Sequence, residues 1–150
     1  MKEFFLFIII FITSTNSLRG QHNIPEKKDN VILINTSNTA EENFKLFGKF
    51  LIDEGFSFAS KDIDFLTLTT SEKTSEGGYK YILLISFKDS QILIRAKCNY
   101  VMFGSSLSNI QLDWTDWEYA KSRNSPSGIA FKAFEPILKK YNGELNYIKQ

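Results

Sequence analysis

The sequence predicts an α+β domain in which an antiparallel sheet of about five strands carries two helices on one face. Residues 79–98 contain two runs rich in Ile, Leu and aromatic residues around a polar break, which is the pattern of a β-hairpin. Two other segments show the apolar spacing of amphipathic helices. Strands and helices do not alternate as they do in parallel sheets, so the expected order is strand, helix, four or five strands, helix.

The N-terminus has the layout of a signal peptide over residues 1–20. A short charged start precedes nine apolar residues at positions 4–12, and small and polar residues follow. As a helix, nine residues span about 14 Å, well short of the ~30 Å hydrocarbon layer, so no stable membrane anchor is expected. Cleavage after Thr15, Ser17 or Gly20 is allowed, and we favour a mature start at Gln21. The protein is therefore expected to be exported, to the periplasm or outside the cell.

Residues 21–30 are polar and predict a flexible lead-in to a single domain at residues 31–150. The only histidine of the chain, His22, lies in this lead-in. Because no further ligand stands at a suitable spacing from it, we expect no metal site.

Charge and cysteine content exclude several functional classes. Without residues 1–20, the chain carries 16 basic and 16 acidic residues and no Lys/Arg cluster, which argues against a nucleic-acid partner. The single cysteine, Cys98, allows no internal disulfide and does not stand where a lipoprotein signal would need it. No cofactor motif is present, and no cofactor is expected.

The first helix is expected at residues 40–54. Thr39 and Glu42 fit a capping box, which satisfies free backbone N–H groups at a helix start. Gly48 borders the apolar stripe, and a close approach of the helix to the sheet would explain it. The stripe itself consists of Ala40, Phe44, Phe47 and Leu51.

Besides the hairpin, strands are expected at residues 31–34, 56–60 and 65–70, which are aliphatic or alternate with a period of two. On the second hairpin strand, alternation places Cys98 on the face that points to the core. We therefore interpret Cys98 as a structural residue and not as a nucleophile, which would need a nearby base. The opposite face of this strand has no predicted cover and is a candidate contact surface for a partner. It carries Leu93, Arg95 and Lys97.

A short sixth strand at residues 110–114 leads into the chemically most suggestive segment. The candidate ligand-binding residues there are Trp114, Asp116, Trp117 and Tyr119. Aromatic rings beside carboxylates are typical of sites that bind sugars or small apolar ligands. Alternatively, the rings close the open end of the sheet–helix sandwich.

The second helix begins at Ser125 and Pro126, an N-cap followed by Pro at the first helical position. Because Pro136 removes a backbone hydrogen bond, a kink or restart is expected near Glu135. A few extended residues should follow. The apolar stripe contains Ala130, Phe134, Ile137 and Tyr141.

A resemblance to known domains rests on residues 42–70, which read ENFKLFGKFLIDEGFSFASKDIDFLTLTT, and on the hairpin and closing helix that follow them. Together with the Gly55-Phe56 turn, this pattern resembles small exported Bacteroidetes domains of unknown function with TBP-like or helix-grip folds. It is also similar to the repeated domain of the envelope lipoprotein BamC. The resemblance covers residues 40–141 and implies a non-catalytic role in an envelope assembly. The lipid-bearing cysteine of the BamC family has no counterpart here.

Three functional hypotheses follow. The first is an exported, non-enzymatic binding or scaffolding domain whose partner is an envelope or secreted protein, since no catalytic constellation is visible. The second is recognition of a carbohydrate or small apolar ligand through Trp114, Trp117 and Tyr119. The third, an unrecognised hydrolase, requires carboxylates gathered in one cleft.

Overall fold

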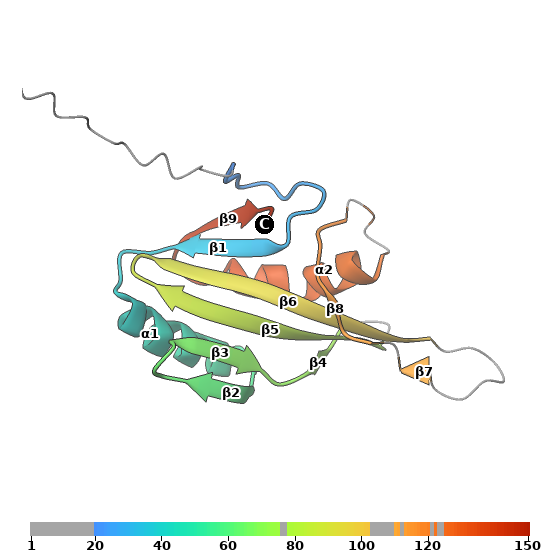
Figure 1. The fold of residues 1–150 in the computed structure, drawn as a ribbon, viewed down its shortest axis with the longest axis horizontal. Helices are drawn as coiled ribbons and strands as arrows, with labels where there is room; N and C mark the ends of the chain where they lie inside the picture. The colour runs from blue at the N-terminus through green and yellow to red at the C-terminus, as the bar shows by residue number, and fades with distance from the viewer. Residues whose placement is uncertain (1–19, 76–77, 103–109, 112, 121, 123–124) are drawn as a thin grey trace, which may run out of the picture.

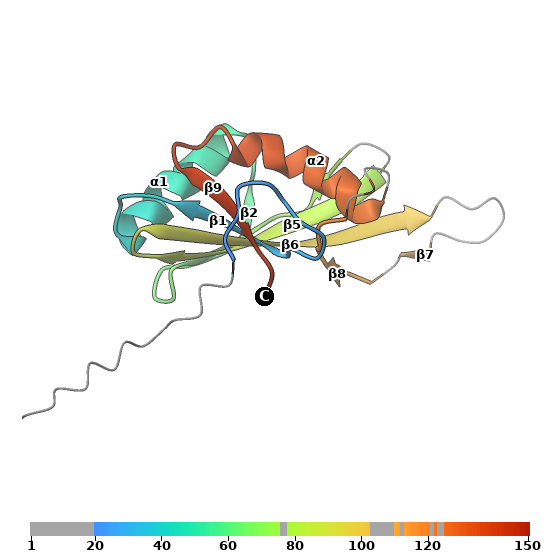
Figure 2. The ribbon, with the colours of Figure 1, turned by 90° about the horizontal axis from the view of Figure 1, so that it is seen from above.

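The computed structural model describes residues 20–75, 78–102, 110–111, 113–120, 122 and 125–150. An antiparallel sheet forms one layer, and two helices form a second layer on one of its faces (Figure 1, Figure 2). The predicted α+β class is confirmed. The predicted signal peptide lies outside the described residues except for Gly20.

The sheet contains more strands than the five predicted. Its main path has the order β2-β3-β5-β6-β1-β9, and β4, β7 and β8 pair with β5 or β6. The additional strands are short or lie near the C-terminus. Their bounds are β1 (Val31–Asn35), β2 (Phe58–Asp62), β3 (Thr67–Thr70), β4 (Lys73–Thr74), β5 (Tyr79–Lys88), β6 (Gln91–Met102), β7 (Ile110–Gln111), β8 (Thr115–Asp116) and β9 (Glu144–Ile148).

The predicted hairpin forms the centre of the sheet as β5 and β6. Its register runs from Tyr79 opposite Tyr100 to Lys88 opposite Gln91. Ser90 closes the turn with a φ of 61°, in the left-handed region. The neighbouring turn residue, Asp89, accepts a hydrogen bond of 2.9 Å from the backbone N–H of Ala40. The hairpin turn is thereby joined to the first helix.

Helix α1 (Ala40–Asp53) begins with the predicted capping box. The hydroxyl of Thr39 accepts from the Glu42 N–H at 3.3 Å, and the Glu42 carboxylate accepts from the Thr39 N–H at 2.9 Å. Gly55 follows the helix with a φ of 78°, a conformation that favours glycine. Both ends of the helix are therefore where local chemistry places them.

Helix α2 (Pro126–Leu138) has Ser125 as its N-cap, whose hydroxyl accepts from the Gly128 N–H at 3.1 Å. The expected break near Glu135 does not divide the helix. Pro136 lies inside it, and the helix continues for two more residues to Leu138. The Leu138 side chain is buried in the core, which stabilises this end of the helix.

The main core fills the space between the helices and the sheet. The apolar stripe residues Phe47, Leu51 and Phe134 are fully buried there. Cys98 is also in this cluster, which confirms that it points into the core. A second, smaller cluster lies on the face away from the helices, where Leu93 packs against the buried residues Val31, Leu33 and Ile148.

Candidate binding site on the open face of the sheet

The sheet face away from the helices, here called the open face, is the candidate site (Figure 2). Strand alternation places a continuous row of side chains across it. The row contains Thr67, Ser86, Leu93, Leu33 and Asn146, each opposite the next in the sheet register. The next row includes Thr69, Leu84 and Arg95. Small hydroxyl residues thus lie beside leucines, and their short side chains leave a depression in the surface.

A shallow groove of about 360 Å³ follows these rows. Leu93 and Arg95, both predicted from sequence as a contact surface, belong to its lining, whereas Lys97 does not. The Arg95 guanidinium donates a hydrogen bond to the Gln150 side chain, which closes one side of the groove. The complete lining is Thr67, Leu68, Thr69, Leu84, Ile85, Ser86, Lys88, Leu93, Arg95 and Gln150.

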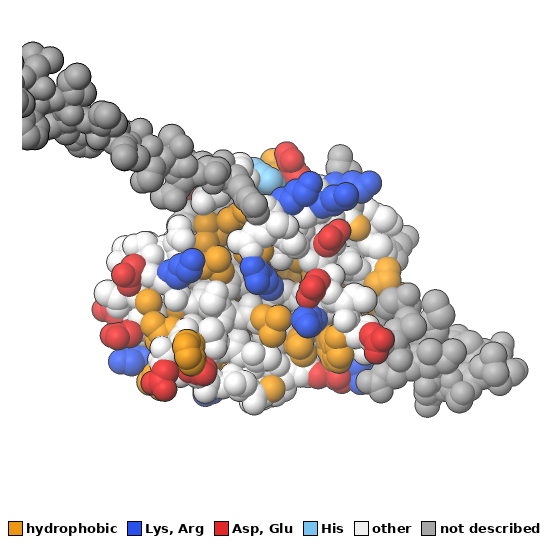
Figure 3. Space-filling model, viewed as in Figure 1, with side chains coloured by type: hydrophobic (Ala, Val, Ile, Leu, Met, Phe, Trp, Pro, Cys, Tyr) orange, Lys and Arg blue, Asp and Glu red, His pale blue; other side chains and the backbone are white. Residues whose placement is uncertain are grey.

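Two positive charges of this face, those of Arg95 and Lys97, have no carboxylate partner in the described part of the chain, whereas Lys80 on the same face of β5 pairs with Glu72 at 2.6 Å. Neither Arg95 nor Lys97 is within 4.0 Å of an acidic oxygen there, although Lys97 stands opposite Asp116 in the sheet register. Figure 3 shows this face with hydrophobic side chains in separate patches between charged ones. The open face therefore offers apolar contacts and uncompensated cations side by side.

Asn99 lies on the same face of β6, two residues beyond Lys97. Its side chain is only 2% exposed, yet its amide nitrogen and oxygen find no hydrogen-bond partner among the described residues. A buried amide without partners costs stability, on the order of 1–3 kcal/mol. Such a residue in a native structure requires an explanation.

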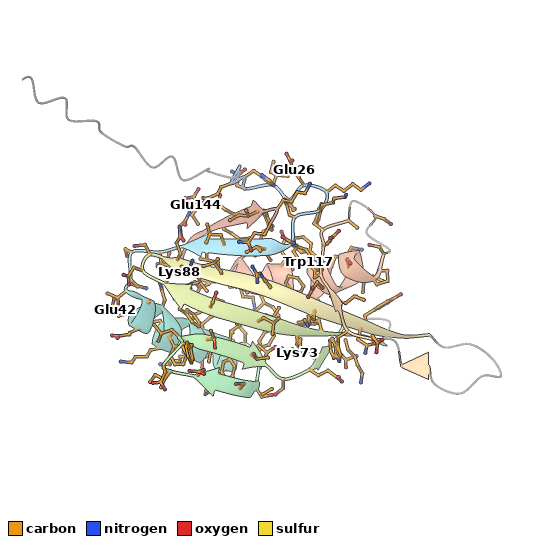
Figure 4. All side chains as sticks on the ribbon, viewed as in Figure 1. Glu26, Glu42, Lys73, Lys88, Trp117 and Glu144 are labelled. Carbon is orange, nitrogen blue, oxygen red and sulfur yellow. The ribbon has the colours of Figure 1, made fainter. Side chains whose placement is uncertain are left out.

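The predicted aromatic segment is not one exposed surface. Trp117 is 1% exposed and belongs to the core, Trp114 and Tyr119 are half-buried, and Asp116 is exposed. Trp117 lies beside α2, where its label stands in Figure 4. Its assignment as a surface ligand-binding residue is therefore corrected, because the ring is enclosed.

Local contacts explain why Trp117 is enclosed. Its ring stacks on Phe131 of α2 with centroids 5.2 Å apart, and its Nε1 donates a 3.1 Å hydrogen bond to the Ser127 carbonyl. The one polar atom of the ring is thereby satisfied without water. This is the alternative in which aromatic rings close the end of the sandwich.

The segment before β1 has contacts that its composition did not predict. His22 pairs with the backbone of Tyr147, extending the edge of β9, and the Lys28 N–H donates to the Tyr119 carbonyl. The His22 Nε2 is 2.7 Å from a carboxylate oxygen of Asp29, which is itself 1% exposed. The hydrogen bond that the His22 ring donates to the Asp29 carboxylate is the main cause that raises the pKa of His22 above 6.5.

No sequence signal singles out this His22–Asp29 pair. A histidine and an aspartate seven residues apart around a proline are common in mobile segments as well. The residues are brought together because the segment is held by β9 at one end and by Tyr119 at the other.

The described residues show no catalytic grouping. Burial raises the pKa of the Cys98 thiol to about 12, so it stays protonated at neutral pH. In the described ranges, no three His, Cys, Asp or Glu side chains gather as metal ligands, and no helix is long and apolar enough to cross a membrane. Four surface grooves among the described residues are each lined by at most one carboxylate.

Comparison with known proteins adds no assignment, since no protein family, curated protein or solved structure matches the chain.

Proposed function

We propose that this protein is an exported, non-enzymatic binding domain that holds a protein partner on the open face of its sheet. The observation that carries the proposal is the part of this face around the groove, where the half-buried Leu93 lies beside Arg95 and Lys97, two cations without carboxylate partners in the described residues. Export is supported by the apolar stretch at residues 4–12.

The shape of the site favours a protein over a small molecule. The groove has a volume of about 360 Å³, near the lower end of the volumes of small-molecule sites. The rows of side chains around it extend across several strands. A flat surface with a leucine centre and an arginine at its rim has the composition of a protein interface. The partner is expected to bring carboxylates toward Arg95 and Lys97 and apolar side chains toward Leu84 and Leu93.

The test is site-specific photocrosslinking in the exported protein. A crosslinker at position 93 should join a single envelope or secreted protein, and one at Lys132, an exposed position on α2, should not. The double variant Arg95→Glu/Lys97→Glu should then weaken binding of the recovered partner by about tenfold or more. Lys132→Glu/Lys149→Glu, with the same change in charge, is the matched control.

Two results would contradict the proposal. Equal crosslinking at positions 93 and 132 would show that the open face is not special. Substrate turnover by the purified domain in a broad hydrolase screen, abolished by a single carboxylate substitution, would show that the protein is an enzyme instead.

A further inference from the structure

We propose that a second surface, formed by the free edge of β2 and the groove between β2 and α1, binds an extended peptide segment that carries carboxylates around a bulky apolar side chain. This surface lies at the opposite edge of the sheet from β9, and its groove is on the helix side. The inference does not depend on the function proposed for the open face.

Strand β2 is the terminal strand of the sheet. Within the described residues it pairs with β3 only, so its other edge presents unpaired backbone groups (Figure 1). An unpaired edge is the structural requirement for adding a peptide as a further strand. A bulge between Phe58 and Ser60 limits the regular part of this edge to residues 60–62, which suits a short segment.

A groove of about 280 Å³ opens beside this edge, between α1 and the sheet. Its apolar floor is made by Phe44, Phe58 and Leu68, with Ile52 at the rim. Gly48 also lines the groove, and a Cβ there would meet Leu68 Cδ1 at 3.4 Å, an ordinary van der Waals contact. A space of this size is smaller than typical small-molecule sites of about 300–1,000 Å³ and suits one large side chain of a peptide.

The geometry of strand addition connects the edge to the groove. Side chains of an added strand alternate between the two faces of the sheet, so every second one would point toward the helix layer. On that side α1 lies over the sheet, and its flank carries Gly48 and Ile52 (Figure 2). An apolar side chain of the added strand would therefore enter the groove while its backbone pairs with β2.

The charges around the groove specify the rest of the ligand. Its lining includes three exposed lysines, Lys45, Lys49 and Lys61, and no acidic residue. In the described part of the chain none of them has a carboxylate oxygen within 4.0 Å, and the Lys61 Nζ stands 4.6 Å from the Phe58 ring centre. Three uncompensated cations around an apolar floor are complementary to carboxylates that flank an apolar side chain.

Further apolar surface lies next to the same strand. Ile63 and Phe65, in the turn that leaves β2, are 69% and 79% exposed, and Ile52 is 51% exposed. Large apolar side chains with this exposure, gathered around one strand, are typical of contact surfaces.

The test uses short blocked peptides of alternating sequence in a fluorescence-anisotropy titration. A peptide with Phe at its centre, Glu two positions before and two positions after it, and Thr at the positions between should bind saturably, because Phe and both Glu side chains then point to the helix side. The same peptide with Lys in place of Glu should not bind. A version with Pro in place of one Thr should bind more weakly, because Pro cannot donate to the strand ladder. Binding should also slow hydrogen exchange of backbone amides in β2.

Variants in which the groove lysines are replaced by Glu test whether the peptide binds at this groove. Lys45→Glu/Lys49→Glu/Lys61→Glu should weaken the Glu peptide by about tenfold or more, and added salt should weaken it as well. The matched control Lys27→Glu/Lys132→Glu/Lys149→Glu carries the same charge change elsewhere. Because all six lysines are exposed or at the groove rim, thermal unfolding should verify that both triple variants stay folded.

Several outcomes would overturn the inference. These are equal binding of the Glu and Lys peptides, equal loss in the control triple variant, or unchanged exchange in β2. Dimerisation in sedimentation that Lys61→Glu abolishes would assign the edge to a second copy instead. Arg95→Glu/Lys97→Glu should leave peptide binding unchanged, so the open-face proposal and this one can fail separately.

Discussion

The indole ring of Trp117 stacks on the phenyl ring of Phe131, with centroids 5.2 Å apart and planes inclined by 10°. Phe134 meets the same indole edge-on at 5.6 Å. These contacts join the segment after β8 to helix α2 and close that end of the core. Trp117 therefore belongs to the core, and its indole face is not available to a ligand at the surface.

Removal of this ring should destabilise the protein strongly. Trp117→Ala is expected to lower the free energy of unfolding by about 3–5 kcal/mol, because it removes a fully buried aromatic side chain and leaves a cavity. Trp114→Ala, at a half-buried position, should cost less. Urea denaturation of both variants gives the comparison, and an equal effect of the two would contradict the packing described for Trp117.

Substitution by alanine should affect the stability of the protein differently at two glycines. A Cβ at Gly143 would stand 2.5 Å from Ile34 Cγ2 and 2.9 Å from the Asn35 carbonyl oxygen, so Gly143→Ala should cost about 1–3 kcal/mol. Gly48→Ala meets only Leu68 at 3.4 Å and gains helix propensity of up to about 1 kcal/mol, so it should be neutral or stabilising. Thermal unfolding distinguishes them.

Attachment of the segment before β1 should depend on pH. Since the pKa of His22 is raised in the folded state, its protonation stabilises the fold, fully below pH 6.5 and less as pH rises through the higher folded pKa. NMR titration of this single histidine should give a pKa above 6.5, which Asp29→Asn should lower.

The effect of the His22–Asp29 ion pair can also be measured at a backbone amide. The Tyr147 N–H, which donates to the His22 carbonyl at 2.8 Å, should exchange faster once the pH exceeds the folded pKa of His22, after correction for intrinsic exchange. His22→Gln should remove this pH dependence. A wild-type exchange rate without such dependence would show that the ion pair does not hold the segment.

Substitution of two buried asparagines should change the free energy of unfolding in opposite directions. Asn43 Oδ1 accepts from the Thr36 hydroxyl at 2.9 Å and its Nδ2 donates to the Lys88 carbonyl at 3.2 Å, so Asn43→Ala should cost about 2–3 kcal/mol. Asn99 has no such partners among the described residues, and Asn99→Val should stabilise by about 1 kcal/mol. Chemical denaturation tests both, and destabilisation by Asn99→Val would reveal a partner for its amide.

Much of the architecture follows from local patterns. The capping box at Thr39 and the N-cap Ser125 were predicted because each depends on residues within one turn. The orientation of Cys98 follows from strand alternation and is confirmed. Of the predicted open-face residues, Leu93 and Arg95 line the groove, since strand periodicity assigns faces but not the shape of the surface.

What the sequence determined by itself is the fold class and the face of each regular element, because backbone dihedrals and side-chain periodicity are set by near neighbours. The tertiary structure alone decided that Trp117 is enclosed by α2, that His22 meets Asp29 on a segment held by β9, and that Gly48 and Leu68 line one groove between α1 and the sheet. Each of these depends on how separate elements pack, and the free energy of such packing is not encoded in any single stretch of chain.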